Sequence, residues 1–283
     1  MKTDSSVLTD TIKRELPYQI LLVGGVLLLL VPLVWMLALS FKTTLQINTQ
    51  NPLDFLPQPF TMDNFAYVLS STNFTHFIWN SFFIAAVSTV GKLVTSLLAA
   101  YAFTQFSFKG RSFLYHLCLL SMFIPFVSTM MPNYLLLSKM GLLNTPWAVI
   151  VPHLADGMGI FLLYQTIRSI PKSIIEAARL DNMSHPDIIR KIILPVIKPS
   201  LIALGIIVFI NSWNEYFWPL LVISDKAEYT LPLALNMFSN VEGGTEWGAV
   251  MAAATLTALP PMVFYMMAQK YIVETFLHSG VKG

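Results

Sequence analysis

Seven charged side chains of this largely apolar chain lie in one segment, residues 176–200, which reads EAARLDNMSHPDIIRKIILPVIKPS. Acids and bases alternate along it, and two small residues, Ala177 and Ala178, precede a bend predicted at Asn182. This surface suits close packing against a protein better than lipid binding, which favours a one-sided basic face. An amphipathic connection lying on lipid headgroups is the alternative interpretation.

Local signals predict two short helices in this segment. Ser173 and Glu176 fit a capping box at the start of the first helix. Ser184 is placed to cap a second helix, which carries an isoleucine stripe at helical spacing. Pro195 and Pro199 are expected to interrupt the approach to the next apolar run. We therefore expect two short helices at an angle on one face of a membrane.

Other polar groups lie inside the apolar runs, where ionisable side chains are costly and suggest function. Lys92 either extends its ammonium to the membrane surface or lines a pathway, and Asp156, expected midway along its run, either pairs with another helix or contacts a substrate. The polar residues around Trp213 either contact a substrate or belong to an interfacial aromatic belt with packing asparagines. The candidate substrate pathway comprises Lys92, Asp156, Asn211, Asn214, Glu215 and Tyr216.

Long apolar runs must position these groups. Hydrophobic residues make up 55% of the 283 residues, and the mean hydropathy is +0.64. Because lipid cannot hydrogen-bond a backbone, runs of about 20 residues predict membrane-spanning helices. We expect an all-α integral membrane protein, a single domain over 1–283, with a helix pair between the fourth and fifth of six transmembrane helices. The expected spans are residues 18–41, 77–102, 113–137, 147–167, 201–223 and 247–268.

The basic residues predict the orientation of these spans. Of the 17 Lys and Arg residues, 13 fall in the N-terminus, the second and fourth connections and the tail, and only three in the other connections. Since basic loops stay cytoplasmic, both termini (residues 1–17 and 269–283) and the connection 168–200 are predicted to face the cytoplasm. The apolar core of the first run is too long for a typical cleavable signal peptide.

Motifs for chemistry within the chain itself are missing. A phosphate-binding loop needs G-x-x-x-x-G-K-[ST], whereas Gly91-Lys92 is followed by Leu93 in a predicted span. The sequence contains no zinc-like His/Cys spacing and no nucleophile elbow, and its single cysteine, Cys118, cannot form an intrachain disulfide. We expect no catalytic residue, no bound metal or cofactor, and no nucleic-acid partner.

The 176–200 segment resembles the EAA loop of ABC-importer permeases, in which EAA is followed by Asp, a turn glycine and later I-x-L-P. Here Asp181 keeps its place, Asn182 replaces the glycine, and Ile192–Pro195 matches the end. WNEYFWPLL at 213–221, TLPLAL at 230–235, TEW at 245–247 and GVKG at 280–283 extend the likeness over nearly the whole chain. Together they resemble the shorter of two paired permeases in the maltose-permease-like, carbohydrate-uptake branch.

The resemblance implies that the first short helix couples to a cytoplasmic ATPase. Glu176 would contact the ATPase, the alanines would allow close packing, and the C-terminal residues would enter the ATPase dimer interface. ATP and Mg²⁺ would bind only the partner ATPases. The implied coupling residues are Glu176, Ala177, Ala178, Asp181, Asn182, Leu194 and Pro195.

The same resemblance implies the remaining partners and the solute. The partners would be a second homologous permease, two ABC ATPase subunits, an extracytoplasmic solute-binding protein and membrane lipid. The solute would be a sugar, with a glycerol-3-phosphate-type permease as the alternative. An ion-coupled secondary transporter using Lys92 and Asp156 is a rival of another class, and an intramembrane enzyme is disfavoured because no paired catalytic groups share a face.

Overall fold

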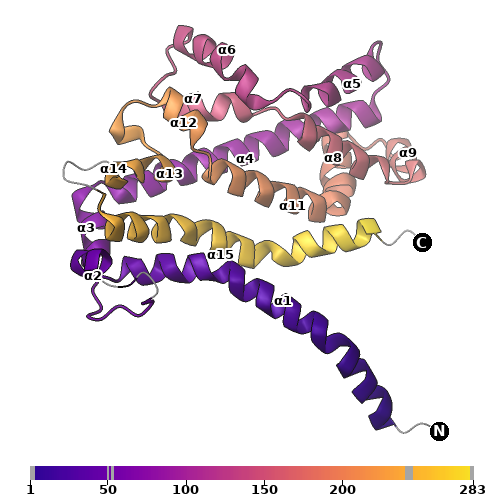
Figure 1. The fold of residues 1–283 in the computed structure, drawn as a ribbon. Helices are drawn as coiled ribbons and strands as arrows, with labels where there is room; N and C mark the ends of the chain where they lie inside the picture. The colour runs from indigo at the N-terminus through magenta and orange to yellow at the C-terminus, as the bar shows by residue number, and fades with distance from the viewer. Residues whose placement is uncertain (1–3, 50, 52–53, 240–244, 281–283) are drawn as a thin grey trace. The chain divides into compact units, whose positions relative to one another are not determined.

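The computed structural model describes residues 4–49, 51, 54–239 and 245–280, and within them the secondary structure is helical, with no strand. Figure 1 follows the helices in chain order. Contacts group the chain into two units, one of residues 1–72 and 237–256 and one of residues 73–236 and 257–283. Each unit is described by itself, and the assignment of all 283 residues to one domain stays a prediction.

The first unit contains a long apolar helix followed by a structured loop. Asn64 Nδ2 donates hydrogen bonds to the carbonyl oxygens of Ser40 (2.9 Å) and Lys42 (2.8 Å), which ties α3 to the end of α1. In the connection between α1 and α3, the Phe41 and Phe60 rings stack with their centroids 4.7 Å apart. These contacts join the described residues before α3 to the end of α1. The elements are α1 (Asp4–Ser40), α2 (Thr44–Thr49), α3 (Asp63–Ser71), α14 (Asn236–Ser239) and α15 (Trp247–Gly280), with α14 and α15 crossing into the second unit.

The second unit is built around α4, which packs most extensively against α8 and α11. The 3-10 turns are η1 (Val151–His153) and η3 (Lys226–Glu228), and the π-helical turn is η2 (Ile189–Ile193). The helices are α4 (Phe74–Gln105), α5 (Arg111–Ser121), α6 (Phe126–Lys139), α7 (Pro146–Ile150), α8 (Gly157–Arg168), α9 (Lys172–Leu180), α10 (His185–Ile188), α11 (Leu194–Trp213), α12 (Phe217–Val222) and α13 (Leu231–Ala234).

In the described residues, four helices are long and apolar enough to cross a membrane, and two bent pairs bring the number to six. The third expected span is not one straight helix, because α5 and α6 meet at 102° where Pro125 interrupts the backbone. The fourth bends by 46° between η1 and α8. The fifth ends at Trp213 rather than Ile223, since residues 214–216 leave the helix before α12 begins.

The 168–200 segment departs from its sequence prediction at the first cap. Helix α9 begins at Lys172 with Pro171 at its N-cap, so Ser173 lies inside the helix and makes no cap hydrogen bond. The predicted capping box is therefore wrong. The turn after α9 is as predicted: Asn182 adopts a left-handed φ of 57°, and the Met183 N–H donates to the carbonyl of Ala178.

The second predicted short helix is the start of a longer one. Ser184 caps it as expected, accepting a hydrogen bond from the Asp187 N–H at 3.4 Å. From α10 the chain continues through η2 into α11 as one helix of 29 residues, His185–Trp213. Pro195 does not interrupt it, because Pro195 lies in the first turn of α11, directly after the π-helical turn.

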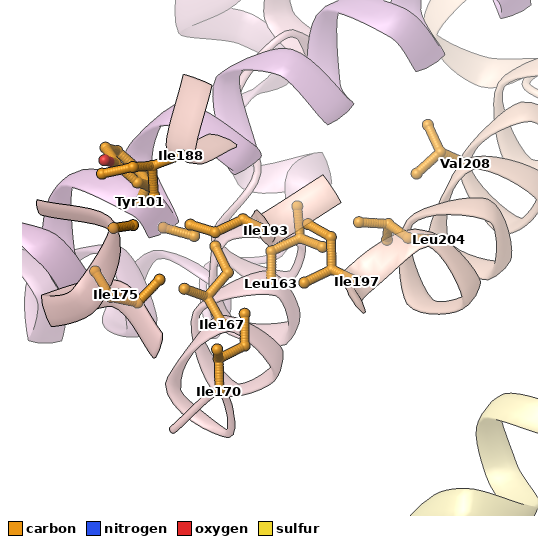
Figure 2. Packing of buried hydrophobic residues seen from close by; sticks show 12 residues of the cluster. Tyr101, Leu163, Ile167, Ile170, Ile175, Ile188, Ile193, Ile197, Leu204 and Val208 are labelled. Atoms are coloured by element: carbon orange, nitrogen blue, oxygen red, sulfur yellow. The ribbon is translucent and has the colours of Figure 1, made fainter. Parts of the chain in front are cut away.

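A cluster of buried apolar side chains, here called the core cluster, attaches α9 to the other helices of the second unit (Figure 2). Ile175 of α9 packs with Ile167 of α8 and Ile193 of η2, so aliphatic surfaces make much of the attachment, beside two hydrogen bonds from Arg179 to Gln105 of α4. The segment is thus packed onto the same helices, α4, α8 and α11, that form the centre of the unit. The core cluster comprises Ala100, Tyr101, Leu163, Ile167, Ile170, Ile175, Ala178, Ile188, Ile193, Ile197, Leu204 and Val208.

Candidate functional site

A polar cavity of about 650 Å³ lies within the second unit, between α4, α11 and the break that precedes α8. Its volume falls in the range of small-molecule sites, about 300–1,000 Å³. Most of its polar lining comes from helices that the sequence analysis identified as spans. The polar lining residues are Ser88, Lys92, Ser121, Thr129, His153, Asp156, Asn211, Ser212 and Glu215.

Lys92 and Asp156 form an ion pair across this cavity, with Lys92 Nζ 3.6 Å from Asp156 Oδ2. Their side chains are 17% and 31% exposed, so both remain accessible from the cavity. Both residues line the cavity and Asp156 also pairs with α4, while their place in a substrate pathway stays a prediction. Opposite charges at membrane depth offset part of each other's desolvation cost, which makes the pair tolerable there.

Asp156 lies at a helix start and not midway along a helix. Its Oδ1 accepts a hydrogen bond from the Met158 N–H at 3.2 Å, which caps α8. The carboxylate therefore has two partners, one fixing the local backbone and one reaching α4. The expected position within a continuous helix was wrong, because the chain breaks between η1 and α8.

Helix α4 contacts the break between η1 and α8 through small and hydroxyl side chains. Thr95 Oγ1 donates a hydrogen bond to the Leu154 carbonyl at 2.5 Å, and Leu154 packs directly on Gly91. One turn further along, Gly159 lies so close to Ser96 that an added Cβ would come within 2.5 Å of its hydroxyl oxygen. A larger side chain at Gly159 would push α8 away from α4, whereas one at Gly91 would displace the Leu154 side chain.

The residues predicted near the end of the fifth span separate into two groups. Asn211 and Glu215 line the cavity together with Lys92 and Asp156, so the structure brings four of the six candidates together. Asn214 and Tyr216 are not among the lining residues. Asn214 follows the last turn of α11, and the Tyr216 hydroxyl accepts a hydrogen bond from Asn236 Nδ2 at 2.5 Å.

Several lining residues were missed by sequence reasoning. Ser88 and His153 matter most, because Ser88 Oγ and His153 Nε2 are buried without a hydrogen-bond partner in the part of the chain that the structure describes. Buried polar atoms of this kind normally find partners, so both can bond to a solute or to water in the cavity. A helical-face count of hydroxyl residues along 77–102 would have indicated Ser88 beside Lys92.

The coupling residues inferred from the sequence occupy different environments. Glu176 and Ala177 are exposed on α9, whereas Ala178 is 5% exposed and belongs to the core cluster. Asp181 follows the last turn of α9 and Asn182 makes the left-handed turn. The last two residues, Leu194 and Pro195, begin α11, where Leu194 is half-buried and Pro195 exposed.

An apolar stripe on α9 was missed by sequence reasoning. Ile174 is 46% exposed and Leu180 is 83% exposed, and with Ala177 between them they recur every third residue along one side of the helix. Large apolar side chains this exposed on a short, polar-ended helix suggest a surface that another protein covers. The signal was available in the sequence as the i, i+3, i+6 spacing of three apolar residues.

Within the described ranges, no group of three or more His, Cys, Asp or Glu side chains is arranged to hold a metal ion. The cavity lining offers hydroxyl, amide and imidazole groups for hydrogen bonding, the Glu215 carboxylate and one opposite-charge pair.

Comparison with known proteins finds similarity between this chain and transport proteins. Residues 92–277 match the family model described as binding-protein-dependent transport system inner membrane component. The chain is 32% identical over 255 residues to the arabinooligosaccharides transport system permease protein AraQ of Halalkalibacterium halodurans, covering 89% of this chain and 91% of that one. It is also 32% identical over 267 residues to the sn-glycerol-3-phosphate transport system permease protein UgpE of Yersinia pestis, covering 92% and 95%.

The fold recurs in a solved structure. A chain from the crystal structure of a bacterial ABC transporter involved in the import of the acidic polysaccharide alginate superposes with a TM-score of 0.82 at 22% identity. The match covers 96% of this chain and 99% of that one, so the fold is shared from end to end.

Proposed function

Because the chain belongs to the family of binding-protein-dependent transport system inner membrane components, we propose that it forms one half of the solute path of an ABC importer for a sugar or sugar-like solute. A second homologous permease supplies the other half. An extracytoplasmic binding protein delivers the solute, and two separate ATPase subunits bind ATP and Mg²⁺. The chain is a multi-pass inner-membrane protein, with both termini and the 168–200 segment in the cytoplasm.

The observation that carries this proposal is the continuity between α9 and the cavity. The exposed stripe of Ile174, Ala177 and Leu180 is free to enter a cleft on an ATPase, with Glu176 beside it for a polar contact. The side of α9 that carries Ile175 and Ala178 is buried in the core cluster, whose other members include residues of α8 and α11, two helices that also line the cavity (Figure 2). Movement of the ATPases would therefore reach the cavity through packed side chains.

The lining of the cavity favours an uncharged, hydroxyl-rich solute. Lys92 is neutralised by Asp156, and Glu215 adds a further acid, so the ionised lining groups do not sum to a positive charge. A phosphate would need an uncompensated cation, whereas hydroxyls of a sugar can bond to the serine, asparagine and carboxylate groups. The likeness to UgpE keeps glycerol 3-phosphate as the second candidate solute.

The Lys92–Asp156 pair would also suit an ion-coupled secondary transporter, because paired ionisable groups in membranes serve proton and ion relays. That function would leave the exposed stripe of α9 without a role. Uptake driven by an ion gradient through this chain alone would favour it.

The test is the double variant Glu176→Lys/Ala177→Arg, examined in the complete complex after reconstitution. Two added cations with long side chains should block docking of α9, so we expect ATP-dependent sugar uptake to fall at least 100-fold and the ATPases not to co-purify. Lys109→Glu, on the exposed loop before α5, is the control and should retain both properties. Normal uptake by the double variant would reject the coupling role of α9.

A further inference from the structure

A second hollow, here called the basic pocket, lies where α4 and α8 end and where α5 and α9 begin. Its volume is about 340 Å³, and four cations line it: Arg111, Arg168, Lys172 and Arg179. Glu176 is the only acidic residue among the lining. The pocket therefore carries an excess of positive charge, in contrast to the polar cavity.

The four cations are not neutralised by carboxylates. In the described part of the chain the ion pairs are Lys92–Asp156 and Lys191–Asp187, and neither involves the basic pocket. Like charges held in one hollow repel each other, so an anion from outside the chain would lower the free energy of this arrangement.

Two of the guanidinium groups are already held in position by neutral acceptors. Arg111 Nη1 donates to the Phe106 carbonyl at 3.1 Å. Arg179 Nη2 donates to the carbonyl of Gln105 at 3.0 Å and to its side-chain oxygen at 3.3 Å. Each guanidinium has five N–H donors, so most remain available, and their planar fork matches the oxygens of a phosphate.

The pocket lies beside the ends of helices that are apolar enough to cross a membrane, which is where lipid headgroups are expected. It is bounded by the ends of α4 and α8 and by the first residue of α5, all elements of apolar spans. Tyr164 lines it, and the Tyr164 ring lies 4.2 Å from that of Tyr115, as in the aromatic belts that mark membrane–water interfaces. Basic pockets between spans at this depth accept anionic lipid headgroups.

We infer that the basic pocket binds the phosphate-bearing headgroup of an anionic membrane phospholipid. Such a lipid connects α9 to the ends of α4 and α5 by charge-assisted hydrogen bonds, on the flank of α9 formed by Lys172, Glu176 and Arg179. The apolar stripe through Ala177 lies on another side of α9, which leaves it free for a protein while the lipid is bound. This inference rests on membrane insertion and not on the solute or the ATPase.

The test uses the complete, purified transport complex in nanodiscs of phosphatidylcholine containing one fifth phosphatidylglycerol. Native mass spectrometry counts the phosphatidylglycerol retained after mild detergent exchange. We expect Arg168→Gln and Lys172→Gln each to lower retention at least threefold. Lys198→Gln, which removes an exposed cation of α11 outside the pocket, should leave retention unchanged. Equal retention by all variants would overturn the inference.

Two further arms distinguish other anions. We expect phosphatidylglycerol to raise the thermal unfolding temperature of the complex, and inorganic phosphate added to complexes in pure phosphatidylcholine not to do so. An equal rise with inorganic phosphate would identify a free phosphate, not a lipid, as the ligand. If Arg168→Gln and Lys172→Gln release the ATPases equally in both lipid compositions, an acidic side chain of the ATPase occupies the pocket and the lipid assignment is wrong. Because uptake is not the readout, these outcomes are independent of the proposed solute.

Discussion

The polar cavity and the attachment of α9 are built from opposite kinds of side chain, although they share α4, α8 and α11. Around the cavity, ionisable and hydroxyl groups make directional contacts such as the Lys92–Asp156 pair. At the attachment, isoleucines such as Ile167 and Ile175 pack without polar contacts. Directional contacts can be exchanged for contacts with a solute, whereas close-packed aliphatic surfaces transmit displacement. We therefore expect the side-chain contacts of the cavity to rearrange during transport and the packed surface of α9 to transmit the movement of the ATPases.

The largest effect should follow from placing a charge in the attachment. Ile167 is 2% exposed within the core cluster, and in Ile167→Asp the new carboxylate would be buried without a partner. We expect the free energy of unfolding of the purified complex to fall by about 3 kcal/mol or more. Thermal unfolding in detergent measures the loss.

Ile174→Asp is the matched control, with both variants also measured in the permease pair without ATPases, because there it makes the same change on an exposed side of α9. Its effect on unfolding should stay within about 0.5 kcal/mol. Similar losses in the two variants would show that the attachment does not depend on apolar packing.

A smaller effect is expected in the cavity. In Asp156→Asn the amide can still accept the Met158 N–H bond, so the change isolates the loss of charge opposite Lys92. Because both side chains are partly exposed, we expect a cost of about 1–3 kcal/mol in thermal unfolding. Adding Lys92→Met should recover more than half of that cost. Strictly additive effects in this double-mutant cycle would show that the pair contributes no coupling energy.

Features that depend on neighbouring residues in the chain were predictable from the sequence. The left-handed turn at Asn182 and the cap at Ser184 each need only a few residues, and both are present. The capping box failed for a local reason as well: helix α9 begins at Lys172, one residue before Ser173, after Pro171. The same three-residue signal fits a helix that starts at Ser173 and one that starts just before it.

Features that depend on distant residues were not predictable in the same way. Ser88, Asp156 and Glu215 are far apart in the chain, and only the packing of α4 against α8 and α11 brings them to one cavity. The bends in the third and fourth spans were missed because hydropathy reports length and composition, and a broken pair of helices has the same composition as a straight one. The prolines at 125 and 152 were the available signals.

The central claim is that partner ATPases drive this chain through the 168–200 segment. Its most direct test is uptake of radiolabelled sugar into proteoliposomes that hold this chain and its paired permease, with solute-binding protein outside, with or without the ATPases and ATP inside. The account predicts uptake only when ATPases and ATP are both present. Uptake by this chain alone, driven by a proton or sodium gradient without any ATPase, would contradict it.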